Sequence, residues 1–282
     1  MTRPYADVIG DPIAQSKSPL IHGFWLDRLG IIGGYERCHV LTEALDSYFA
    51  DRRADHAWRG CNVTMPHKQA VMPLLDRISP EAERIGAVNT VVARDSALEG
   101  HNTDGVGFIE PLLPLIADKT RRFAYLVGSG GAARAIADAL TEHGFTLSSF
   151  SRDPAKADRE IGRYIPDKGL LFGMEALHGG PLARISGGAD RINVLVNASP
   201  LGMAGFAPLD IAADDLAGDL VVYDIVTHPV DTPLLSAARA QGLRTIDGLA
   251  MLIGQAAAAF EKFFGQPPPR EHDAELRAIL TT

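Results

Sequence analysis

Short apolar runs alternate with segments of helical periodicity in the N-terminal third of the chain. Residues 5–10 form an apolar run that ends in "GDPIAQSKSP", which predicts a strand and a turn. A helix is expected next, with Ser18 as N-cap, Pro19 at the first helical position and Gly30 as the stop. Further strands are expected at 34–40, 59–64 and 88–94, and helices at 42–54, 67–76 and 80–87. This alternation predicts an α/β sheet with parallel pairs.

A second alternating series begins near residue 121. An apolar strand leads into a glycine turn and an amphipathic helix that ends at Gly144. Buried strands are then expected at 145–153, 192–200, 220–226 and 243–248, with the spacing of βα units. This part of the chain is therefore predicted to be a doubly wound Rossmann domain. The apolar stretch 247–265 includes Gln255, Glu261 and Lys262, so we expect a buried helix there and not a membrane span.

Composition and charge narrow the possible function classes. The hydrophobic fraction of 46% and the charged fraction of 22% are typical of a globular protein, and 282 residues suit two domains. A net charge of −8 argues against nucleic acid or an anionic membrane as the partner. The only cysteines are Cys38 and Cys61, and no histidine pair has metal-ligand spacing. We therefore expect no disulfide scaffold, no metal and no secretory signal, and a cytoplasmic protein.

The sequence "GSGGAA", which begins at Gly128, lies directly between a predicted strand and a predicted helix. In that context the glycine pattern indicates a dinucleotide-binding turn. Gly128 permits the tight turn, and Gly130 allows a pyrophosphate to reach backbone N–H groups at the helix N-terminus. The alternative is a turn that only packs the helix on the strand. The predicted cofactor contacts here are Gly128, Ser129, Gly130, Gly131 and Ala132.

The end of the next strand bears on the choice of dinucleotide. Ser151, Arg152 and Lys156 supply a hydroxyl and two cations, which suit the 2′-phosphate of NADP. Asp153 lies between the cations and would either repel that phosphate or pair with Arg152, so NAD stays possible. A solvated turn with one surface ion pair is the alternative interpretation.

Seven motifs resemble those of the shikimate dehydrogenase family, in order and in rough spacing. They are "SKSP", "NVTMPHK", "GAVNT", "NTDGVGF", "GSGGAA", "NASPLGM" and "GLAMLIGQAAAAF", and the resemblance extends from about Tyr5 to Gly265. It implies a two-domain α/β protein. Residues 1–104 and 248–282 would form the substrate domain, and 105–247 the Rossmann NADP domain, with the C-terminal helix returning to the substrate domain. The implied activity is reversible NADP-dependent reduction of 3-dehydroshikimate to shikimate, in chorismate and aromatic amino acid biosynthesis.

The resemblance also implies roles for individual residues. Lys68 and Asp104 would be the catalytic pair, facing the nicotinamide across the cleft between the two domains. Ser16 and Ser18 would hold the substrate carboxylate. The remaining implied contacts are Thr64, Asn89 and Gln255 for the ring hydroxyls, and Met203 and Gly248 near the cofactor, with packing as the alternative for Met203.

These residue types fit the implied chemistry. A small polyhydroxylated acid needs several neutral donors and acceptors, which Ser, Thr, Asn and Gln provide. Oxidation of a hydroxyl releases a proton with the hydride, and Lys68 would either carry that proton or stabilise oxyanion charge as an ammonium. His67 is expected to be structural.

Two departures from the family pattern leave alternatives open. Thr227 occupies the place of the usual tyrosine in D-x-x-Y-x-P, and Lys156 stands where a second arginine is usual. The alternatives are a dehydrogenase for quinate or an amino analogue, with NADP or NAD, and a non-catalytic paralogue that senses NADP or a shikimate-like acid. Methylenetetrahydrofolate dehydrogenase shares the two-domain plan and a lysine, but it lacks "SKS" and "NTDG". The expected partner is a small-molecule substrate, and the protein would be a monomer or a homodimer.

Overall fold

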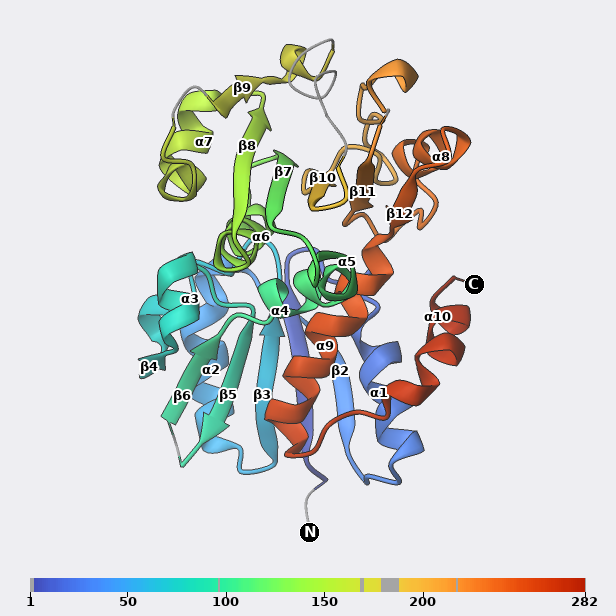
Figure 1. Cartoon of the computed structure of the whole chain (residues 1–282). Helices are drawn as coiled ribbons and strands as arrows, with labels where there is room; N and C mark the ends of the chain where they lie inside the picture. The colour runs from blue at the N-terminus through green and yellow to red at the C-terminus, as the bar shows by residue number, and fades with distance from the viewer. Residues whose placement is uncertain (1–2, 96, 168–169, 179–187, 217, 282) are drawn as a thin grey trace. The chain divides into compact units, whose positions relative to one another are not determined.

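The computed structural model describes residues 3–95, 97–167, 170–178, 188–216 and 218–281 (Figure 1). The chain divides into two compact units. The first consists of Met1–Gly107 and Ile253–Thr282, and the second is Phe108–Leu252. The chain passes from the first unit to the second within helix α4 (Asp104–Ile109) and returns within helix α9 (Gly248–Phe264). Each unit is built around its own six-stranded sheet.

The first unit contains a mixed sheet, with strand order β2-β1-β3-β5-β6-β4. Its strands are β1 (Tyr5–Gly10), β2 (Gly34–His39), β3 (Trp58–Val63), β4 (Arg77–Ile78), β5 (Thr90–Arg94) and β6 (Ala97–His101). Strand β1 is parallel to β2 and β3, whereas β5 is antiparallel to both β3 and β6. The expectation of parallel pairs is therefore wrong for the two pairs that β5 forms, whereas β4 and β6 are parallel. β5 ends at Arg94 and β6 begins at Ala97, and consecutive strands so close in the sequence pair antiparallel because a parallel pair needs a long crossover.

Helices cover both faces of this sheet. On one face, Tyr48 and Phe49 of α2 pack with Ile9 and Trp58. On the other face, Ala6 and Val8 pack with Ala259 and Phe263 of α9. The α-helices of this unit are α1 (Ser18–Arg28), α2 (Leu45–Ala54), α3 (Pro80–Ile85) and α10 (Asp273–Thr281), together with most of α9, and its short 3-10 helices are η1 (Thr42–Ala44), η2 (Met72–Leu74) and η9 (Arg270–His272).

Two local expectations are wrong in this unit. Lys17, not Ser18, is the N-cap residue of α1, because Ser18 is the first residue of the helix. The backbone N–H of Ser18 donates to the Ser16 hydroxyl (3.3 Å). Residues 67–76 form turns and η2 instead of an α-helix. Pro73 explains this, since proline has no N–H to donate and its ring clashes with the carbonyl four residues earlier. It also disfavours the α conformation at Met72.

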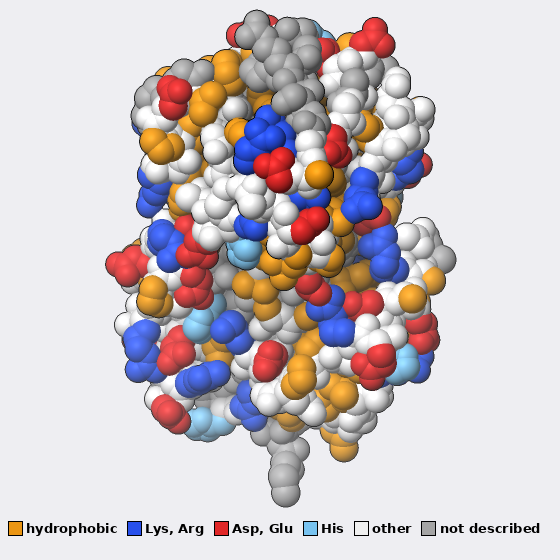
Figure 2. All heavy atoms as spheres, viewed as in Figure 1, with side chains coloured by type: hydrophobic (Ala, Val, Ile, Leu, Met, Phe, Trp, Pro, Cys, Tyr) orange, Lys and Arg blue, Asp and Glu red, His pale blue; other side chains and the backbone are white. Residues whose placement is uncertain are grey.

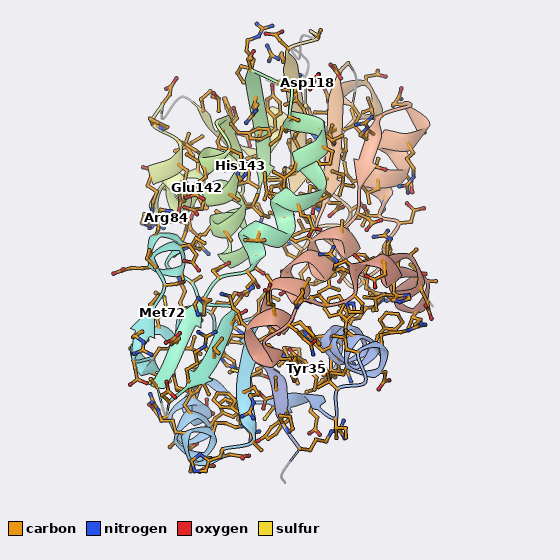
Figure 3. All side chains as sticks on the ribbon, turned by 60° about the horizontal axis from the view of Figure 1, so that its bottom comes forward. Tyr35, Met72, Arg84, Asp118, Glu142 and His143 are labelled. Atoms are coloured by element: carbon orange, nitrogen blue, oxygen red, sulfur yellow. The ribbon has the colours of Figure 1, made fainter. Side chains whose placement is uncertain are left out.

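His22 of α1 is fully buried in an aromatic cluster of the first unit. Its ring stacks on Tyr35 with centroids 3.9 Å apart and lies near Phe260 and Phe263 of α9; Figure 3 labels Tyr35 beside these helices. Neither ring nitrogen of His22 has a hydrogen-bond partner among the described residues. Burial lowers the pKa of His22 from its ordinary value of 6.5 to about 3.

We expect His22 to make the free energy of unfolding fall as the pH drops below 6.5. In that range the unfolded chain binds a proton at His22 that the folded chain excludes until the pH approaches 3. Each pH unit in this window corresponds to about 1.4 kcal/mol, so roughly 2–3 kcal/mol would be lost between pH 6.5 and pH 4.5. Urea denaturation of the wild type and His22→Leu at both pH values measures this difference. Ile21→Val, also fully buried on α1, is the control, and equal pH dependence in the wild type and His22→Leu would contradict the prediction.

The second unit contains an entirely parallel sheet, with strand order β12-β11-β10-β7-β8-β9. Its strands are β7 (Arg121–Val127), β8 (Phe145–Ser151), β9 (Leu171–Gly173), β10 (Arg191–Asn197), β11 (Leu220–Asp224) and β12 (Arg244–Ile246). Strand β7 is central and the chain winds outwards from it in both directions. This is the predicted doubly wound Rossmann topology. Strand β9 was not expected, because three residues are too few to give a periodicity signal.

Helices also cover both faces of the second sheet. Ile136 and Leu140 of α6 belong to one core cluster, with Leu126 and Val194 of the sheet. Leu234 and Leu235 of α8 belong to the other. The α-helices of this unit are α5 (Leu113–Ile116), α6 (Gly131–Glu142), α7 (Pro154–Ile161) and α8 (Pro233–Ala240), and its 3-10 helices are η3 (Glu110–Leu112), η4 (Gly162–Tyr164), η6 (Met174–Leu177) and η8 (Ala213–Asp215).

The surface and the cysteines are ordinary for a globular protein. Positive and negative side chains are interspersed on the visible face of each unit (Figure 2). Cys38 and Cys61 are both free thiols. No helix in the described part of the chain is long and apolar enough to cross a membrane. Within the same residues, no group of three or more His, Cys, Asp or Glu side chains is placed to hold a metal ion.

Candidate active site

The topology of the first sheet brings three separate segments of the chain to one edge. Strand β5 lies between β3 and β6 and runs antiparallel to both. The end of β3, the beginning of β5 and the end of β6 therefore lie side by side. Lys68 follows β3, Asn89 directly precedes β5, and Asp104 follows β6. The sequence pattern predicted strand β5 but not its direction, and this antiparallel direction is what assembles the predicted catalytic residues.

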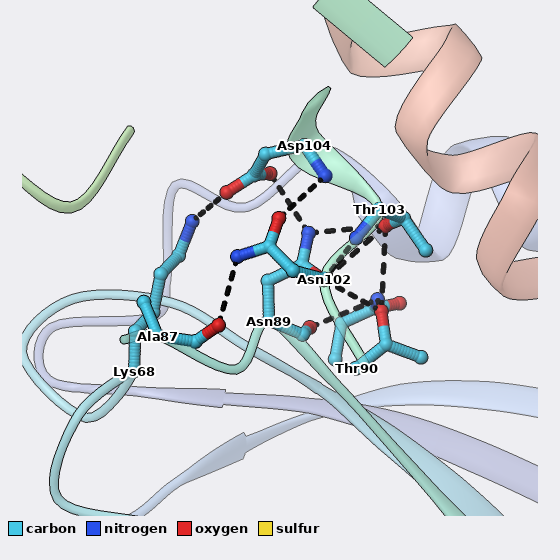
Figure 4. Close-up of polar contacts among 8 residues, drawn as sticks. Lys68, Ala87, Asn89, Thr90, Asn102, Thr103 and Asp104 are labelled. Carbon is cyan, nitrogen blue, oxygen red and sulfur yellow. Dashed lines mark hydrogen bonds and ion pairs between the residues drawn. The ribbon is translucent and has the colours of Figure 1, made fainter. Parts of the chain in front are cut away.

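Lys68 and Asp104 form an ion pair at this edge (Figure 4). The Lys68 Nζ lies 2.5 Å from Asp104 Oδ2, and the two side chains are 17% and 7% exposed. The backbone at Lys68 is held as well, because its carbonyl accepts a hydrogen bond from Val88 N–H (2.8 Å). A lysine with this little exposure has few positions available to its ammonium group. The pair therefore places one amino group, with a charge partner, at a defined point.

Hydrogen bonds fix the Asp104 carboxylate on its other side. Asn89 Nδ2 donates to Asp104 Oδ1 (2.8 Å) and to Thr103 Oγ1 (3.0 Å). Asn102 Oδ1 accepts from the backbone N–H of Asp104 (3.0 Å), and Asn102 Nδ2 donates to the Ala87 carbonyl (2.9 Å). Both carboxylate oxygens are therefore occupied, and the orientation of Asp104 is determined by its neighbours.

A buried chain of hydrogen bonds extends from this site into the sheet. Thr90 Oγ1 donates to Asn89 Oδ1 (2.9 Å) and accepts from Asn62 Nδ2 (3.1 Å), and Asn62 Oδ1 accepts from the hydroxyl of Tyr35 (2.6 Å). Burial raises the pKa of Tyr35 well above its usual value, so Tyr35 is a neutral donor. Sequence reasoning missed Asn62, Thr90 and Tyr35. One signal in the sequence could have found them. All three carry a polar group at a strand position, where the alternating pattern predicts a buried side chain, and a buried polar group needs a hydrogen-bond partner.

The other predicted substrate contacts lie in the same unit. Ser16 and Ser18 flank the start of α1 and contact each other, as described above. Thr64 follows β3 and lies against the end of β1. A Cβ added at Gly10 would be 2.5 Å from Thr64 Cγ2, so a larger residue at position 10 would displace Thr64. Gln255 is half-buried on α9. In the described residues, no hydrogen bond joins the side chains of Ser16, Ser18 or Thr64 to the Lys68–Asp104 pair.

His67 is buried and anchored to the protein backbone. Its Nε2 lies 2.6 Å from the carbonyl oxygen of Val40, which follows β2. This contact ties the turn that carries Lys68 to the end of β2, in agreement with the structural role expected from the sequence.

In the second unit, the glycine turn joins β7 to α6 in the way expected of a phosphate-binding loop. Gly128 has φ +103°, a conformation that favours glycine. Gly130 is the N-cap of α6, it has no side chain to cap the helix, and a Cβ there would meet no atom within 4 Å. Gly131 and Ala132 begin α6, and Ser129 lies in the turn. Space and uncapped backbone N–H groups at a helix N-terminus fit a pyrophosphate.

The contact that Asp153 makes after β8 shows what its carboxylate does. Its carboxylate accepts from the Lys156 backbone N–H (2.9 Å) and is the N-cap of α7. Asp153 therefore does not form an ion pair with Arg152. Arg152 and Lys156 are exposed, and neither has a carboxylate partner among the described residues. The Ser151 hydroxyl is buried and donates to the Asp153 carbonyl (3.2 Å). Two unpaired cations beside a parallel strand end suit a phosphate monoester.

A buried carboxylate organises the loops that carry the remaining predicted cofactor contacts. Asp224, fully buried at the end of β11, accepts from Asn197 Nδ2 (3.0 Å) and from the Thr232 hydroxyl (2.7 Å). Asn197 also donates to the Leu201 carbonyl (2.8 Å), which fixes the loop that contains Met203. The second contact, Gly248, begins α9, and a Cβ there would lie 2.3 Å from the Val226 carbonyl oxygen, so the position requires glycine. Thr227, in the usual place of tyrosine, is half-buried in the loop after β11.

Similarity to characterised proteins extends over the whole chain. The shikimate dehydrogenase (NADP(+)) of Sphingopyxis alaskensis is 52% identical over 281 residues, which cover 98% of this chain and 97% of that protein. The chain belongs to the shikimate dehydrogenase family. Residues 8–91 match the family's substrate binding domain, and residues 248–275 match the shikimate 5′-dehydrogenase C-terminal domain.

Solved structures of the family have the same fold. Shikimate 5-dehydrogenase from Listeria monocytogenes, in complex with shikimate and NAD, aligns with a TM-score of 0.85 and 32% identity, over 99% of this chain and 96% of that one. The Thermus thermophilus enzyme in complex with NADP(H) and shikimate aligns with a TM-score of 0.80 and 34% identity, over 98% and 99% of the two chains. The two-domain α/β fold expected from the family motifs is thus confirmed.

Proposed function

We propose that this protein is a shikimate dehydrogenase that reversibly reduces 3-dehydroshikimate to shikimate with NADPH, in aromatic amino acid biosynthesis. Membership of the family supports the reaction class. The observation that carries the proposal is the contact between Lys68 Nζ and Asp104 Oδ2, because it places an amino group and a carboxylate at one point of the predicted substrate unit. The expected compartment is the cytoplasm, the expected partner is the small-molecule substrate, and the protein would be a monomer or a homodimer.

In the proposed mechanism, the side chains of the protein transfer the proton of the substrate hydroxyl. When bound, NADP⁺ supplies the hydride acceptor. In the oxidation direction, the Lys68 amine takes the proton of the substrate hydroxyl, and in the reduction direction the Lys68 ammonium returns it to the carbonyl oxygen. Asp104 holds the ammonium form in place through its contact with Nζ. Asn89 keeps the carboxylate oriented toward Lys68.

Substrate recognition is proposed to use neutral polar groups of the first unit. Ser16 and Ser18 would hold the carboxylate, and Thr64, Asn89 and Gln255 would bind the ring hydroxyls. The free hydroxyl proton of Ser16 supports this role. Its oxygen accepts from the Ser18 N–H, and no acceptor takes the Ser16 hydroxyl proton among the described residues, so that proton can be donated to an anion.

The proposed cofactor is NADP, bound in the second unit. Its pyrophosphate would lie on the turn from Gly128 to Ala132, and its 2′-phosphate against Arg152, Lys156 and Ser151. Met203 and Gly248 are proposed to line the remainder of the cofactor site. The N-cap role of Asp153 supports NADP over NAD, because this carboxylate is engaged with α7 and leaves both cations available.

Arg152→Ala is expected to lower kcat/KM for NADP⁺ by about 30-fold and to leave kcat/KM for NAD⁺ nearly unchanged. A charge-assisted hydrogen bond to a phosphate contributes more than a neutral one, and NAD⁺ lacks that phosphate. Steady-state kinetics with both dinucleotides measure the ratio. Arg159→Ala, in the last turn of α7, is the matched control. An equal loss with both dinucleotides would contradict the assigned contact.

The proposed reaction is tested by following reduced-nicotinamide absorbance with purified protein in a panel of shikimate or quinate with NADP⁺ or NAD⁺. We expect the highest kcat/KM for shikimate with NADP⁺. Preference for quinate or NAD⁺ would reassign the substrate or the cofactor within the same reaction class. Binding of shikimate and NADP⁺ by calorimetry without turnover would instead support a sensor.

A further inference from the structure

Three side-chain contacts join the loop that carries Ser16 and Ser18 to the rest of the first unit. Arg37 of β2 donates from Nε (2.9 Å) and Nη2 (2.5 Å) to the carbonyl oxygen of Ser16. Lys17 Nζ donates to the carbonyl of Leu280 in the last turn of α10. His39 Nε2 lies 2.7 Å from Asp11 Oδ1, near the start of the loop. The loop is thus fixed to β2 on one side and to α10 on the other.

Strand geometry explains why β2 can hold this loop. Tyr35, Arg37 and His39 are alternate residues of β2, so their side chains lie on the same face of the sheet. Each contacts a different point of the loop or of the hydrogen-bond chain beside it. Tyr35 hydrogen-bonds to Asn62 and is also within hydrogen-bonding reach of Ser18, Arg37 binds the Ser16 carbonyl, and His39 binds Asp11. One short strand therefore supports the β2 side of the loop.

The charge at this loop is the second observation. Arg37 is exposed and Lys17 is half-buried, and neither has a carboxylate partner among the described residues, although the protein has a net charge of −8. Both donate to main-chain carbonyls instead, so neither positive charge is paired with a carboxylate. The Arg37 guanidinium contacts the backbone of Ser16, the residue whose hydroxyl is proposed to bind the carboxylate. A substrate carboxylate there would lie within a Debye length, about 8 Å, of this charge.

We propose that Arg37, assisted by Lys17, is a positioning and specificity residue that selects substrates with a carboxylate. It fixes the main chain of Ser16 and supplies positive charge behind the hydroxyls, which are themselves neutral. This inference rests on the proposed function, because it takes Ser16 and Ser18 as the carboxylate site. Through-space attraction favours the anionic substrate over a neutral derivative of the same shape.

The test compares shikimate with its methyl ester, which is neutral, in the wild type, Arg37→Met and Arg37→Lys. For Arg37→Met we expect kcat/KM for shikimate to fall about fivefold through KM. We expect kcat/KM for the ester to change less than twofold. Arg37→Lys retains the charge and should keep most of the preference for the acid. Raising the salt concentration should weaken the preference for the acid in the wild type and leave Arg37→Met nearly unaffected.

The outcomes separate this inference from the proposed function. Equal losses for acid and ester in Arg37→Met would show that Arg37 only supports the fold, and no loss for either would show that it has no role; both overturn the inference. A wild type without turnover of shikimate would defeat the proposed function instead. In that case calorimetric dissociation constants of shikimate for the wild type and Arg37→Met still decide the inference. Equal constants would overturn it, and a fivefold weaker constant in the variant would support it.

Discussion

Replacing Lys68 with alanine is expected to lower kcat for shikimate oxidation by about 10³-fold, within the range usual for loss of a general acid–base group. The reason is that Lys68 Nζ, held at 2.5 Å from Asp104, is the proposed carrier of the substrate hydroxyl proton. The dissociation constant for NADP⁺ should stay unchanged, since the predicted cofactor contacts lie in other segments. Steady-state absorbance assays and calorimetric titration with NADP⁺ measure the two quantities.

Two further variants distinguish the possible roles of this lysine. Lys68→Arg keeps a permanent cation that does not release its proton in proteins. If Lys68 carries the proton, this variant should lose nearly as much activity as Lys68→Ala. Substantial activity in Lys68→Arg would contradict a proton carrier and indicate that the positive charge alone matters. Lys119→Ala is the matched control, because the Lys119 ammonium group contacts only Asp118 and a main-chain carbonyl of the second unit among the described residues.

Asp104→Asn is expected to lower kcat by about 10²-fold. The substitution preserves the size of the side chain but removes the charge that holds the Lys68 ammonium, so the amino group becomes free to leave its position. A displacement of about 1 Å is enough for a loss of this size. The introduced amide also has one acceptor oxygen fewer than the carboxylate, and its NH₂ group would face another donor, either Asn89 Nδ2 or Lys68 Nζ. Parallel measurement of kcat and of the denaturation midpoint separates catalysis from stability.

The control for Asp104 is a carboxylate without a role in the site. Asp118→Asn is suitable because that side chain is 76% exposed and contacts only Lys119 among the described residues. We expect its kcat and its denaturation midpoint to match those of the wild type. Wild-type kcat in Asp104→Asn would show that the charge of Asp104 is not needed to hold Lys68.

Local signals were sufficient for much of the fold. The strand expected at 5–10 is β1, with identical bounds, and the glycine turn joins a strand to a helix as predicted. These elements depend on apolar runs and on glycine positions within a few residues of each other. The same local logic failed at 67–76, where the apolar spacing was helical but Pro73 prevented an α-helix.

The candidate site itself depended on pairings that no local pattern contains. Lys68 and Asp104 are 36 residues apart, and they meet because β5 reverses direction between β3 and β6. Periodicity did not show this reversal, since a strand has the same alternation whichever way it runs. The role of Asp153 was likewise undecided in the sequence, because a carboxylate between two cations can pair with either or cap the next helix.

The sequence by itself thus determined the family, the doubly wound half of the chain and the identity of the residues proposed to act, because these are written in contiguous motifs and short-range periodicity. Only the tertiary structure decided how the residues are held. The order of strands in the first sheet, the chain of hydrogen bonds from Asp104 to Tyr35, and the contact of Arg37 with Ser16 all join distant segments. Such contacts form when buried polar groups must find partners during packing, and that requirement acts on the folded chain as a whole.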